Sequence, residues 1–300
     1  MADNDLIIGG ASGYNWDQLK YWVNSIKKTG YTGSIVLVAT NMSGETVKKL
    51  TENNVSVYAY GKRTPDGGIE KTENNIPPHV ERFLFIWDYL RKNENEYRFV
   101  TVTDTRDVIF QKDPFEWMEH NNIGRSSVKL VAPSEAMYYK DEPWNRDNLR
   151  QAYGDYFYEN LGFKNMLISC CGVIAGTSEY VKDLVFNMFA NSINRPIPVV
   201  DQVVFNMLIN TQPYKGVTYT APMSTAWTLQ AGTMNDPTKV EQFKDKWLEL
   251  PPYFYDGKFL TAGGNEFCIV HQYDRVPEWK KYVEQKFRQE DQSNYFRYTA

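Results

Sequence analysis

The chain has 300 residues, enough for one large domain or two small ones with a substantial core. It is 42% hydrophobic and 23% charged, an ordinary composition for a globular protein. The formal net charge is -4, and no block of basic residues stands out, which argues against electrostatic capture of nucleic acid.

The cysteines and the N-terminus suggest a compartment. Cys170 and Cys171 are adjacent, Cys268 is distant, and no C-x-x-C spacing typical of a metal site is present. We expect all three thiols to be reduced and buried, which suits an intracellular protein. Residues 1–5 lack the basic and apolar regions of a signal peptide, and no apolar run approaches the roughly 18 residues of a transmembrane segment. These features predict a soluble, cytoplasmic protein.

The first sixty residues alternate between strand-like and helix-like segments. Apolar, β-branched runs are typical of strands, and apolar residues at a spacing of three and four are typical of helices. This order predicts right-handed crossovers and a parallel sheet. The predicted strands are 6–10, 34–39 and 55–60, and the predicted helices are 16–28 and 45–53.

The first strand ends in glycines. Gly9, Gly10 and Gly13 do not form the G-x-G-x-x-G fingerprint, which disfavours a dinucleotide cofactor but leaves bare backbone that could lie against a base or ribose. Residues 61–78 are polar and predict a loop. A helix over 80–93 follows, with Arg82 off its apolar stripe. Two interpretations of Arg82 are open, a solvated arginine and a contact to a phosphate or base.

The rest of the chain is organised around the stretch from Phe99 to Phe110, a strand that stops on acids and restarts as an apolar run. Asp104 and Asp107 stand where the strand would emerge from a sheet, and ligands of open α/β sheets bind beyond the carboxyl ends of the strands. Mg²⁺ is usually held by one or two carboxylates together with substrate phosphates. The motif alone fits either a metal-diphosphate site or two acids in a turn.

The second half of the chain contributes two further polar candidates. Asp201 precedes an apolar helix and could be simply its N-cap. His271 lies at the end of the last predicted strand, 267–275, where a hydrogen-bonded structural histidine is the common case. We also predict a helix starting at Asp113-Pro114, strands over 128–133 and 166–176, a long irregular functional region over 134–163, a helix over 180–193, and a charged helix and polar end over 277–300.

In their order and spacing these features resemble the GT-A fold of nucleotide-sugar glycosyltransferases. The resemblance rests on the opening strand-loop-helix, Thr103 to Phe110 in the place of the family's Asp-x-Asp signature, Ser169 to Gly176 with Asp201-Gln202 downstream, and Val270 to Tyr273 with its late histidine. It implies an α/β fold of GT-A type, with a Rossmann-like, mostly parallel central sheet flanked by helices. It also implies a single domain over 1–300, with a nucleotide-sugar-binding half at 1–112 and an acceptor-binding half at 113–300.

The resemblance also implies roles for individual residues. Asp104, Asp107 and His271 would hold Mn²⁺ or Mg²⁺. Position 106 is Arg rather than Asp, so the signature is Asp-x-x-Asp instead of Asp-x-Asp. Arg106 would then neutralise part of the negative charge of the leaving nucleoside diphosphate. Asp201 is the candidate general base of an inverting enzyme, or the group that orients the acceptor in a retaining one. The implied contacts to the nucleotide sugar are Ile8, Gly9, Gly10, Tyr14, Arg82, Asp104 and Lys258.

The implied function is metal-dependent transfer of a hexosyl or pentosyl group from a UDP- or GDP-sugar to a hydroxyl of a glycan or glycoprotein. A sugar nucleotidyltransferase is one alternative, but such enzymes usually carry a basic, glycine-rich loop, and residues 9–13 contain no Lys or Arg. The other alternative is a non-catalytic carbohydrate-binding protein on a degenerate transferase fold, which the altered signature motivates.

Overall fold

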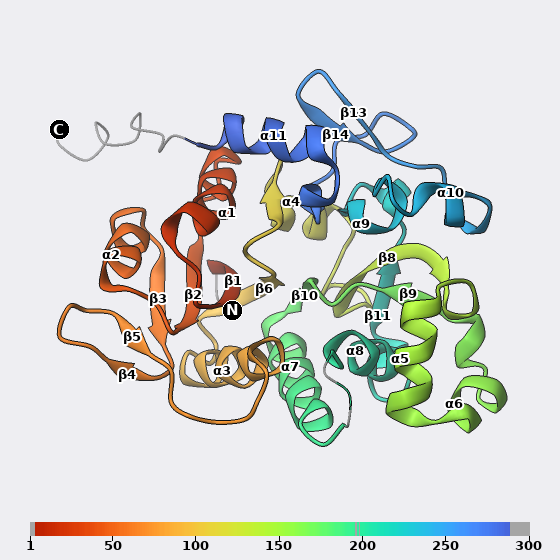
Figure 1. Cartoon of the computed structure of the whole chain (residues 1–300), viewed down its shortest axis with the longest axis horizontal. Coiled ribbons are helices and arrows are strands. Elements are labelled where there is room, and N and C mark those ends of the chain that lie inside the picture. Colours follow the sequence, from red (N-terminus) through yellow and green to blue (C-terminus); the bar gives the residue numbers. More distant parts are fainter. Residues whose placement is uncertain (1–3, 196, 198, 289–300) are drawn as a thin grey trace.

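The computed structural model describes residues 4–195, 197 and 199–288 (Figure 1). Its central sheet has the strand order β11-β8-β10-β6-β1-β2-β3, with β9 paired to β8. The pairs β1–β2, β2–β3 and β1–β6 are parallel, and β10 runs antiparallel to both β6 and β8, so the predicted α/β class with a mostly parallel sheet is confirmed. The strands are β1 (Asn4–Ser12), β2 (Ser34–Thr40), β3 (Ser56–Ala59), β6 (Tyr97–Thr103), β8 (Leu130–Tyr138), β9 (Leu167–Ser169), β10 (Val173–Thr177) and β11 (Thr218–Ala221).

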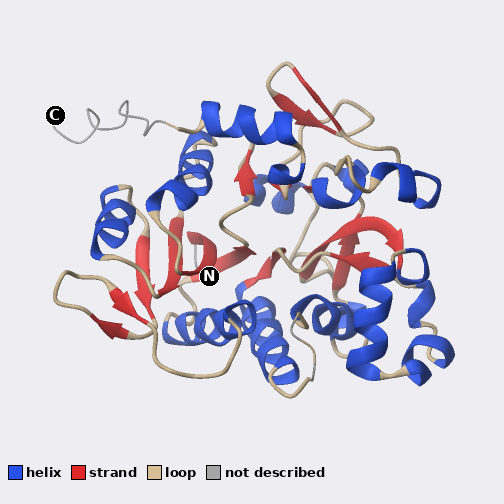
Figure 2. Cartoon of the chain, in the orientation of Figure 1, coloured by secondary structure: helices blue, strands red, loops and turns tan. Residues whose placement is uncertain are grey.

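Helices flank this sheet on both faces (Figure 2). Capping residues explain where two of these helices begin. Asn15 and Gln18 form a reciprocal capping box on α1. Asp113 caps α4 ahead of Pro114, at the helix start predicted from the sequence. The α-helices are α1 (Trp16–Lys28), α2 (Gly44–Glu52), α3 (Pro78–Lys92), α4 (Pro114–His120), α5 (Pro143–Tyr153), α6 (Asp155–Asn160), α7 (Ser178–Ser192), α8 (Asp201–Ile209), α9 (Ala231–Met234), α10 (Val240–Phe243) and α11 (Pro277–Lys286). Short 3-10 turns cover Tyr139–Asp141, Phe163–Asn165, Tyr214–Gly216, Met223–Thr225, Lys244–Lys246 and Tyr273–Arg275.

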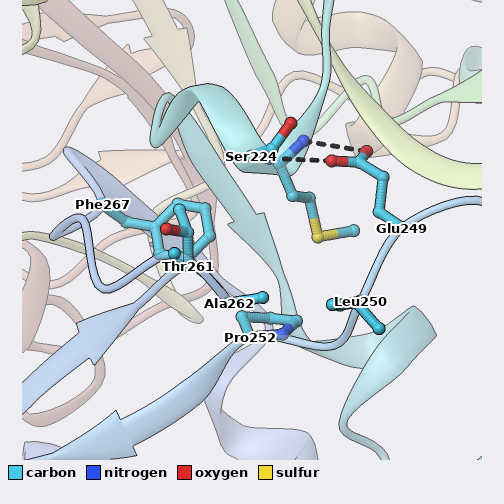
Figure 3. Close-up of a pocket in the computed structure, with 9 residues that line it drawn as sticks. Ser224, Glu249, Leu250, Pro252, Thr261, Ala262 and Phe267 are labelled. Atoms are coloured by element: carbon cyan, nitrogen blue, oxygen red, sulfur yellow. Dashed lines mark hydrogen bonds between the residues drawn. The ribbon is translucent and has the colours of Figure 1, made fainter.

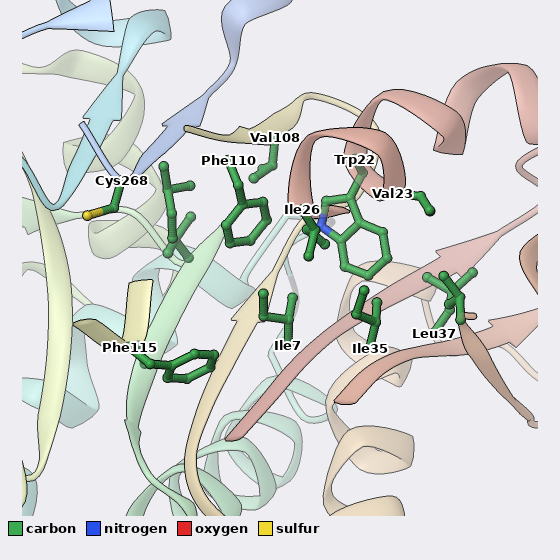
Figure 4. Packing of buried hydrophobic residues seen from close by; sticks show 14 of the residues in the cluster. Ile7, Trp22, Val23, Ile26, Ile35, Leu37, Val108, Phe110, Phe115 and Cys268 are labelled. Atoms are coloured by element: carbon green, nitrogen blue, oxygen red, sulfur yellow. The ribbon is translucent and has the colours of Figure 1, made fainter. Parts of the chain in front are cut away.

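The two faces of β1 carry separate cores, because successive side chains of a strand point to opposite faces. Leu6 and Ile8 pack with residues of α3 and α7. Ile7 packs on the other face with Trp22 of α1 and Phe110 (Figure 4). Both faces of the parallel strands are therefore buried, which is the usual condition of a parallel sheet.

A second, three-stranded sheet has the order β12-β15-β7, formed by β12 (Thr228–Gln230), β15 (Ile269–His271) and β7 (Val108–Phe110). Its strand β7 follows β6 of the central sheet after only four residues, 104–107. The acidic motif is therefore the connection between the two sheets. Two hairpins complete the sheets, β4 (Lys62–Arg63) with β5 (Ile69–Glu70) and β13 (Tyr253–Tyr255) with β14 (Lys258–Leu260).

Four predicted segments differ in the structure. The region 134–163 is not irregular, because β8 runs on to Tyr138 and α5 and α6 follow, with Leu149 and Tyr158 buried. Gly154, at φ +87°, separates these two helices. The predicted strand 166–176 is split into β9 and β10 by a turn that ends at Gly172, and the predicted strand 267–275 ends at His271. The predicted loop 61–78 contains the β4–β5 hairpin.

All three cysteines are free and buried, as predicted. Over the residues described, no helix has the length and apolar character needed to cross a bilayer. The predicted charged helix near the C-terminus is α11, whereas the expected polar end lies mostly in 289–300, outside the described residues.

Candidate functional site

Asp104, Asp107 and His271 form a group whose ligand atoms all lie within 4.8 Å of one another. His271 Nε2 lies 3.4 Å from Asp104 Oδ2 and 3.8 Å from Asp107 Oδ1. Two backbone hydrogen bonds hold the acidic turn, from Asp104 N–H to the Gly172 carbonyl (2.8 Å) and from Gln272 N–H to the Asp107 carbonyl (2.7 Å). The carboxyl ends of β6 and β15 thus meet at one point.

The imidazole of His271 is oriented so that one nitrogen faces the acids. His271 Nδ1 lies 2.9 Å from Gln230 Oε1 and 3.4 Å from Cys170 Sγ. The amide oxygen of Gln230 can only accept, so Nδ1 carries the proton. Nε2 is buried and has no hydrogen-bond partner in the described structure. Two carboxylates and an oriented imidazole form a donor set that fits a divalent cation.

The two carboxylates differ in their electrostatic surroundings. Burial raises the pKa of Asp104, but the Arg82 guanidinium and then His271 outweigh it and hold that pKa below its usual range. Burial raises the pKa of Asp107, and the neighbouring Asp104 charge adds to the effect, although His271 opposes it. Burial lowers the pKa of His271, but Cys170, Asp104 and Asp107 raise it well above its usual value. A proton and a cation would therefore compete for His271 Nε2.

Arg82 joins this group to Asp201. Its guanidinium forms an ion pair with Asp104, and its Nη2 lies 3.6 Å from Asp201 Oδ2. The side chain of Arg82 is only 11% exposed, so the interpretation as a solvated arginine is wrong. The N-cap interpretation of Asp201 is also wrong, because Val200 is the N-cap of α8 and the Asp201 carboxylate faces Arg82 instead.

Two adjacent cavities open beside these residues. The first, about 190 Å³, is lined by Gly10, Tyr14, His79, Arg82, Asp104, Thr105, Arg106, Asp107 and Asp201. The second, about 320 Å³, is lined by Gly10, Ala11, Ser12, Tyr14, Tyr60, Pro78, His79 and Arg82. In the first, Arg106 is about half exposed, and its Nη2 lies 3.5 Å from Asp107 Oδ2 and 3.6 Å from Asp274 Oδ2. The structure thus brings Gly10, Tyr14, Arg82 and Arg106 to the acids.

Three of the predicted contact residues lie elsewhere. Lys258 is in the β13–β14 hairpin, where its ammonium pairs with Glu266 (3.1 Å), and it lines neither cavity. Ile8 is fully buried in the core on the α3 side. Gly9 also lines neither cavity, since Thr105 packs against it, closer than a Cβ would allow.

Sequence reasoning expected a close backbone approach at Gly172, without naming what approaches it, and assigned no role here to Gln230 or Cys170. Gly172 belongs to the turn between β9 and β10, and a Cβ at this position would lie 2.4 Å from His271 Cε1 and 2.9 Å from Asp104 Oδ2. A side chain therefore does not fit without moving the two ligand candidates. The glycine itself was the signal for the expected close approach, because a glycine in or beside a strand often marks one.

We expect Gly172→Ala to weaken binding of Mn²⁺ by about 10- to 100-fold, the range typical when groups that orient ligands are disturbed. The physical reason is that His271 and Asp104 must separate to admit the methyl group. Isothermal titration with Mn²⁺ measures the effect. Gly216→Ala is the matched control, because no atom lies within 4 Å of its added Cβ. Equal Mn²⁺ affinities in the two variants would contradict the assignment.

Another cavity, of about 200 Å³, is a poor candidate for chemistry (Figure 3). Its one carboxylate, Glu249, accepts hydrogen bonds from the backbone N–H groups of Met223 (3.1 Å) and Ser224 (2.8 Å). The remaining lining is mostly apolar, including Leu250, Pro252 and Phe267. The role of Glu249 is therefore structural, because it stabilises the 3-10 turn at Met223–Thr225.

No family model and no curated protein matches this chain. Among solved structures, the chain is similar to the apo structure of the WbbM bifunctional glycosyltransferase, with 13% sequence identity and a TM-score of 0.57 over 95% of this chain and 51% of that chain. It is also similar to the apo form of the glycosyltransferase GlyE of Streptococcus pneumoniae TIGR4, with 14% identity and a TM-score of 0.51 over 95% of this chain and 61% of that chain. The chain thus spans about half to three fifths of these proteins.

These likenesses show the fold. The chain has the GT-A glycosyltransferase fold that its sequence resembles, with a large, mostly parallel central sheet flanked by helices. Fold alone does not define an activity, which has to be argued from the site.

Proposed function

We propose that this protein is a metal-dependent glycosyltransferase that moves a sugar from a UDP- or GDP-sugar to a hydroxyl of a glycan or glycoprotein. The observation that carries the proposal is the group Asp104, Asp107 and His271 at the meeting point of β6 and β15. The imidazole Nε2 of His271 makes no hydrogen bond in the described structure and faces two carboxylates, and both carboxylates line a polar cavity.

In this proposal the two adjacent cavities hold the donor. Gly10 and Tyr14 border both cavities, and Tyr60 borders the larger one, which offers bare backbone and aromatic surface to a nucleoside. The diphosphate lies beside Asp104 and Asp107, where bound Mn²⁺ or Mg²⁺ supplies Lewis-acid stabilisation of the leaving nucleoside diphosphate. Arg106 is exposed in this cavity and adds a preorganised positive charge for the same leaving group.

Asp201 is the proposed acceptor-side carboxylate. It is 6% exposed, lines the cavity that contains the acids, and lies 3.6 Å from Arg82. In an inverting reaction it would take the proton of the acceptor hydroxyl, a contribution of about 10²- to 10⁴-fold. In a retaining reaction it would orient the acceptor. Arg82 positions it by binding Asp104 and Asp201 together.

The proposal also assigns the two substrates to different halves of the chain. Apart from Asp201, the lining residues of the two donor cavities all come from 1–112, the proposed nucleotide-sugar-binding half. The proposed acceptor-binding half, 113–300, supplies Asp201 and His271 to the site.

The direct test is nucleotide release from a panel of UDP- and GDP-sugars with Mn²⁺ or Mg²⁺, beside titration of UDP and GDP themselves. We expect one nucleotide to bind only with the cation, and its sugar to be slowly released by water even without an acceptor. EDTA should abolish both signals. A protein that binds no nucleoside diphosphate in the presence of Mn²⁺ would contradict the proposal and favour the non-catalytic carbohydrate-binding alternative.

A further inference from the structure

A third cavity, of about 130 Å³, lies within the second half of the chain. Gln202 and Gln272 are in its lining, and they directly follow Asp201 and His271 in the sequence. It shares no lining residue with the two donor cavities. The lining consists of Glu135, Met137, Glu142, Trp144, Asn145, Gln202, Gly232, Thr233, Lys239, Phe243 and Gln272.

Two carboxylates are buried in this lining. Glu135 is 9% exposed and accepts hydrogen bonds from Gln202 Nε2 (3.0 Å) and Thr233 Oγ1 (3.1 Å). Glu142 is 7% exposed and accepts both of its hydrogen bonds, from N–H and Nδ2 of Asn145, at the single oxygen Oε2. Neither carboxylate has an ion-pair partner in the part of the chain that the structure describes. Burial, followed by the Glu142 charge, raises the pKa of Glu135.

Two hydrogen-bond acceptors of this cavity are free in the described structure. The Oε1 atom of Glu142 makes no hydrogen bond within the described residues. The Nε2 group of Gln202 already donates to Glu135 and Asn145, which leaves its amide oxygen free. A buried carboxylate is costly unless a donor reaches it, so the free oxygen of Glu142 favours an occupant rich in hydroxyl or ammonium groups.

The apolar part of the lining fits the same kind of occupant. Trp144, near the start of α5, is 49% exposed although it is large and apolar. Aromatic side chains bury large flat surfaces, and the faces of sugar rings offer matching C–H groups. The only cationic side chain of the lining, Lys239, is exposed. An occupant with its own carboxylate would meet two buried acids.

We propose that this cavity binds the terminal sugar of the acceptor and selects a neutral or amino sugar over an acidic one. This inference rests on the proposed function. A donor sugar is bonded to the diphosphate and must stay beside Asp104. The third cavity shares no lining residue with the donor cavities, although Gln202 and Gln272 of its lining directly follow Asp201 and His271. Glu142 Oε1 and Glu135 accept from ring hydroxyls or an ammonium, and Trp144 covers one ring face.

Saturation-transfer difference NMR with methyl hexosides tests the proposal, using neutral, 2-amino and uronic acid forms of each ring in the presence and absence of UDP and Mn²⁺. We expect at least one neutral or amino glycoside to bind, and its uronic acid counterpart to bind at least tenfold more weakly. Glu142→Gln keeps the oxygen that caps α5 but removes the negative charge. It should therefore reduce the difference in affinity between the neutral or amino glycoside and its uronic acid counterpart. Trp144→Ala should weaken binding of every form.

Glu241→Gln is the matched control for the charge change, because Glu241 is an exposed acid on the nearby α10. Binding of no glycoside by the wild type, tightest binding of a uronic acid, or glycoside affinities in Glu142→Gln and Trp144→Ala equal to the control would each overturn the inference. Titration of UDP with Mn²⁺ on the wild type separates the two proposals. Nucleotide binding without glycoside binding overturns only the third cavity, and glycoside binding without nucleotide binding overturns only the transferase.

Discussion

Asp107→Ala is expected to lower cation-dependent nucleotide release by at least about 10³-fold, because a Lewis acid supplies several kcal/mol of transition-state stabilisation. Asp107 is 6% exposed, and its ligand atom lies within 4.8 Å of those of Asp104 and His271. The rate of release from the preferred donor, measured over a range of Mn²⁺ concentrations, checks this prediction. Undiminished release would show that the metal-site assignment is wrong.

A second substitution at Asp107 distinguishes an effect on cation binding from an effect on stability. Burial raises the pKa of Asp107, so its ionised form opposes folding at neutral pH as long as no cation is bound. Asp107→Asn should therefore melt no lower than the wild type in EDTA, and should lose the stabilisation that Mn²⁺ gives the wild type. Asp245→Ala, which changes an exposed acid far along the chain, is the control for both measurements.

Trp22→Ala is expected to lower the free energy of unfolding by about 3–5 kcal/mol, the range for truncating a buried aromatic side chain. Trp22 is fully buried in the core between α1 and the central sheet (Figure 4). Its Nε1 donates a hydrogen bond to Thr103 Oγ1 (2.9 Å), which would lose its partner. Denaturant unfolding measures the loss, provided that the m-values of the two proteins agree.

The conservative variant divides this effect into two parts. Trp22→Phe keeps most of the apolar volume but removes the hydrogen bond, so we expect it to cost about 1–3 kcal/mol. Equal losses for the two variants would show that the hydrogen bond, not the packing, holds the helix to the sheet. Thr103 directly precedes Asp104, so Trp22→Ala should also weaken Mn²⁺ binding.

The parallel strands and the acids were predictable because their signals are local. A β-branched run such as Phe99 to Thr103 has a clear strand pattern. Acids that directly follow such a strand lie at the carboxyl edge of the sheet, whatever the position of the strand in the strand order. His271 was predictable for the same reason, as a polar residue ending an apolar strand. Its role as a ligand candidate still depended on the resemblance, because a single histidine carries no spacing pattern.

The partners that orient these residues were not predictable, because they come from distant segments. Gln230 reaches His271 only through the pairing of β12 with β15, and Gly172 approaches through the turn after β9. Lys258 was included as a cation that would contact the nucleotide sugar, and its charge does not tell where its hairpin lies. The helices α5 and α6 were missed because their many Tyr, Asp and Arg residues hide a short apolar face.

The four-residue connection between β6 and β7 has a mechanical consequence. Asp104 is attached to the central sheet, whereas Asp107 and His271 are attached to the three-stranded sheet. A cation held by all three would cross-link the two sheets, and its binding free energy would be added to the stability of their contact. The relative orientation of the sheets would in turn set the affinity for the cation. A substitution that weakens the packing between the two sheets would therefore lower the affinity for the cation.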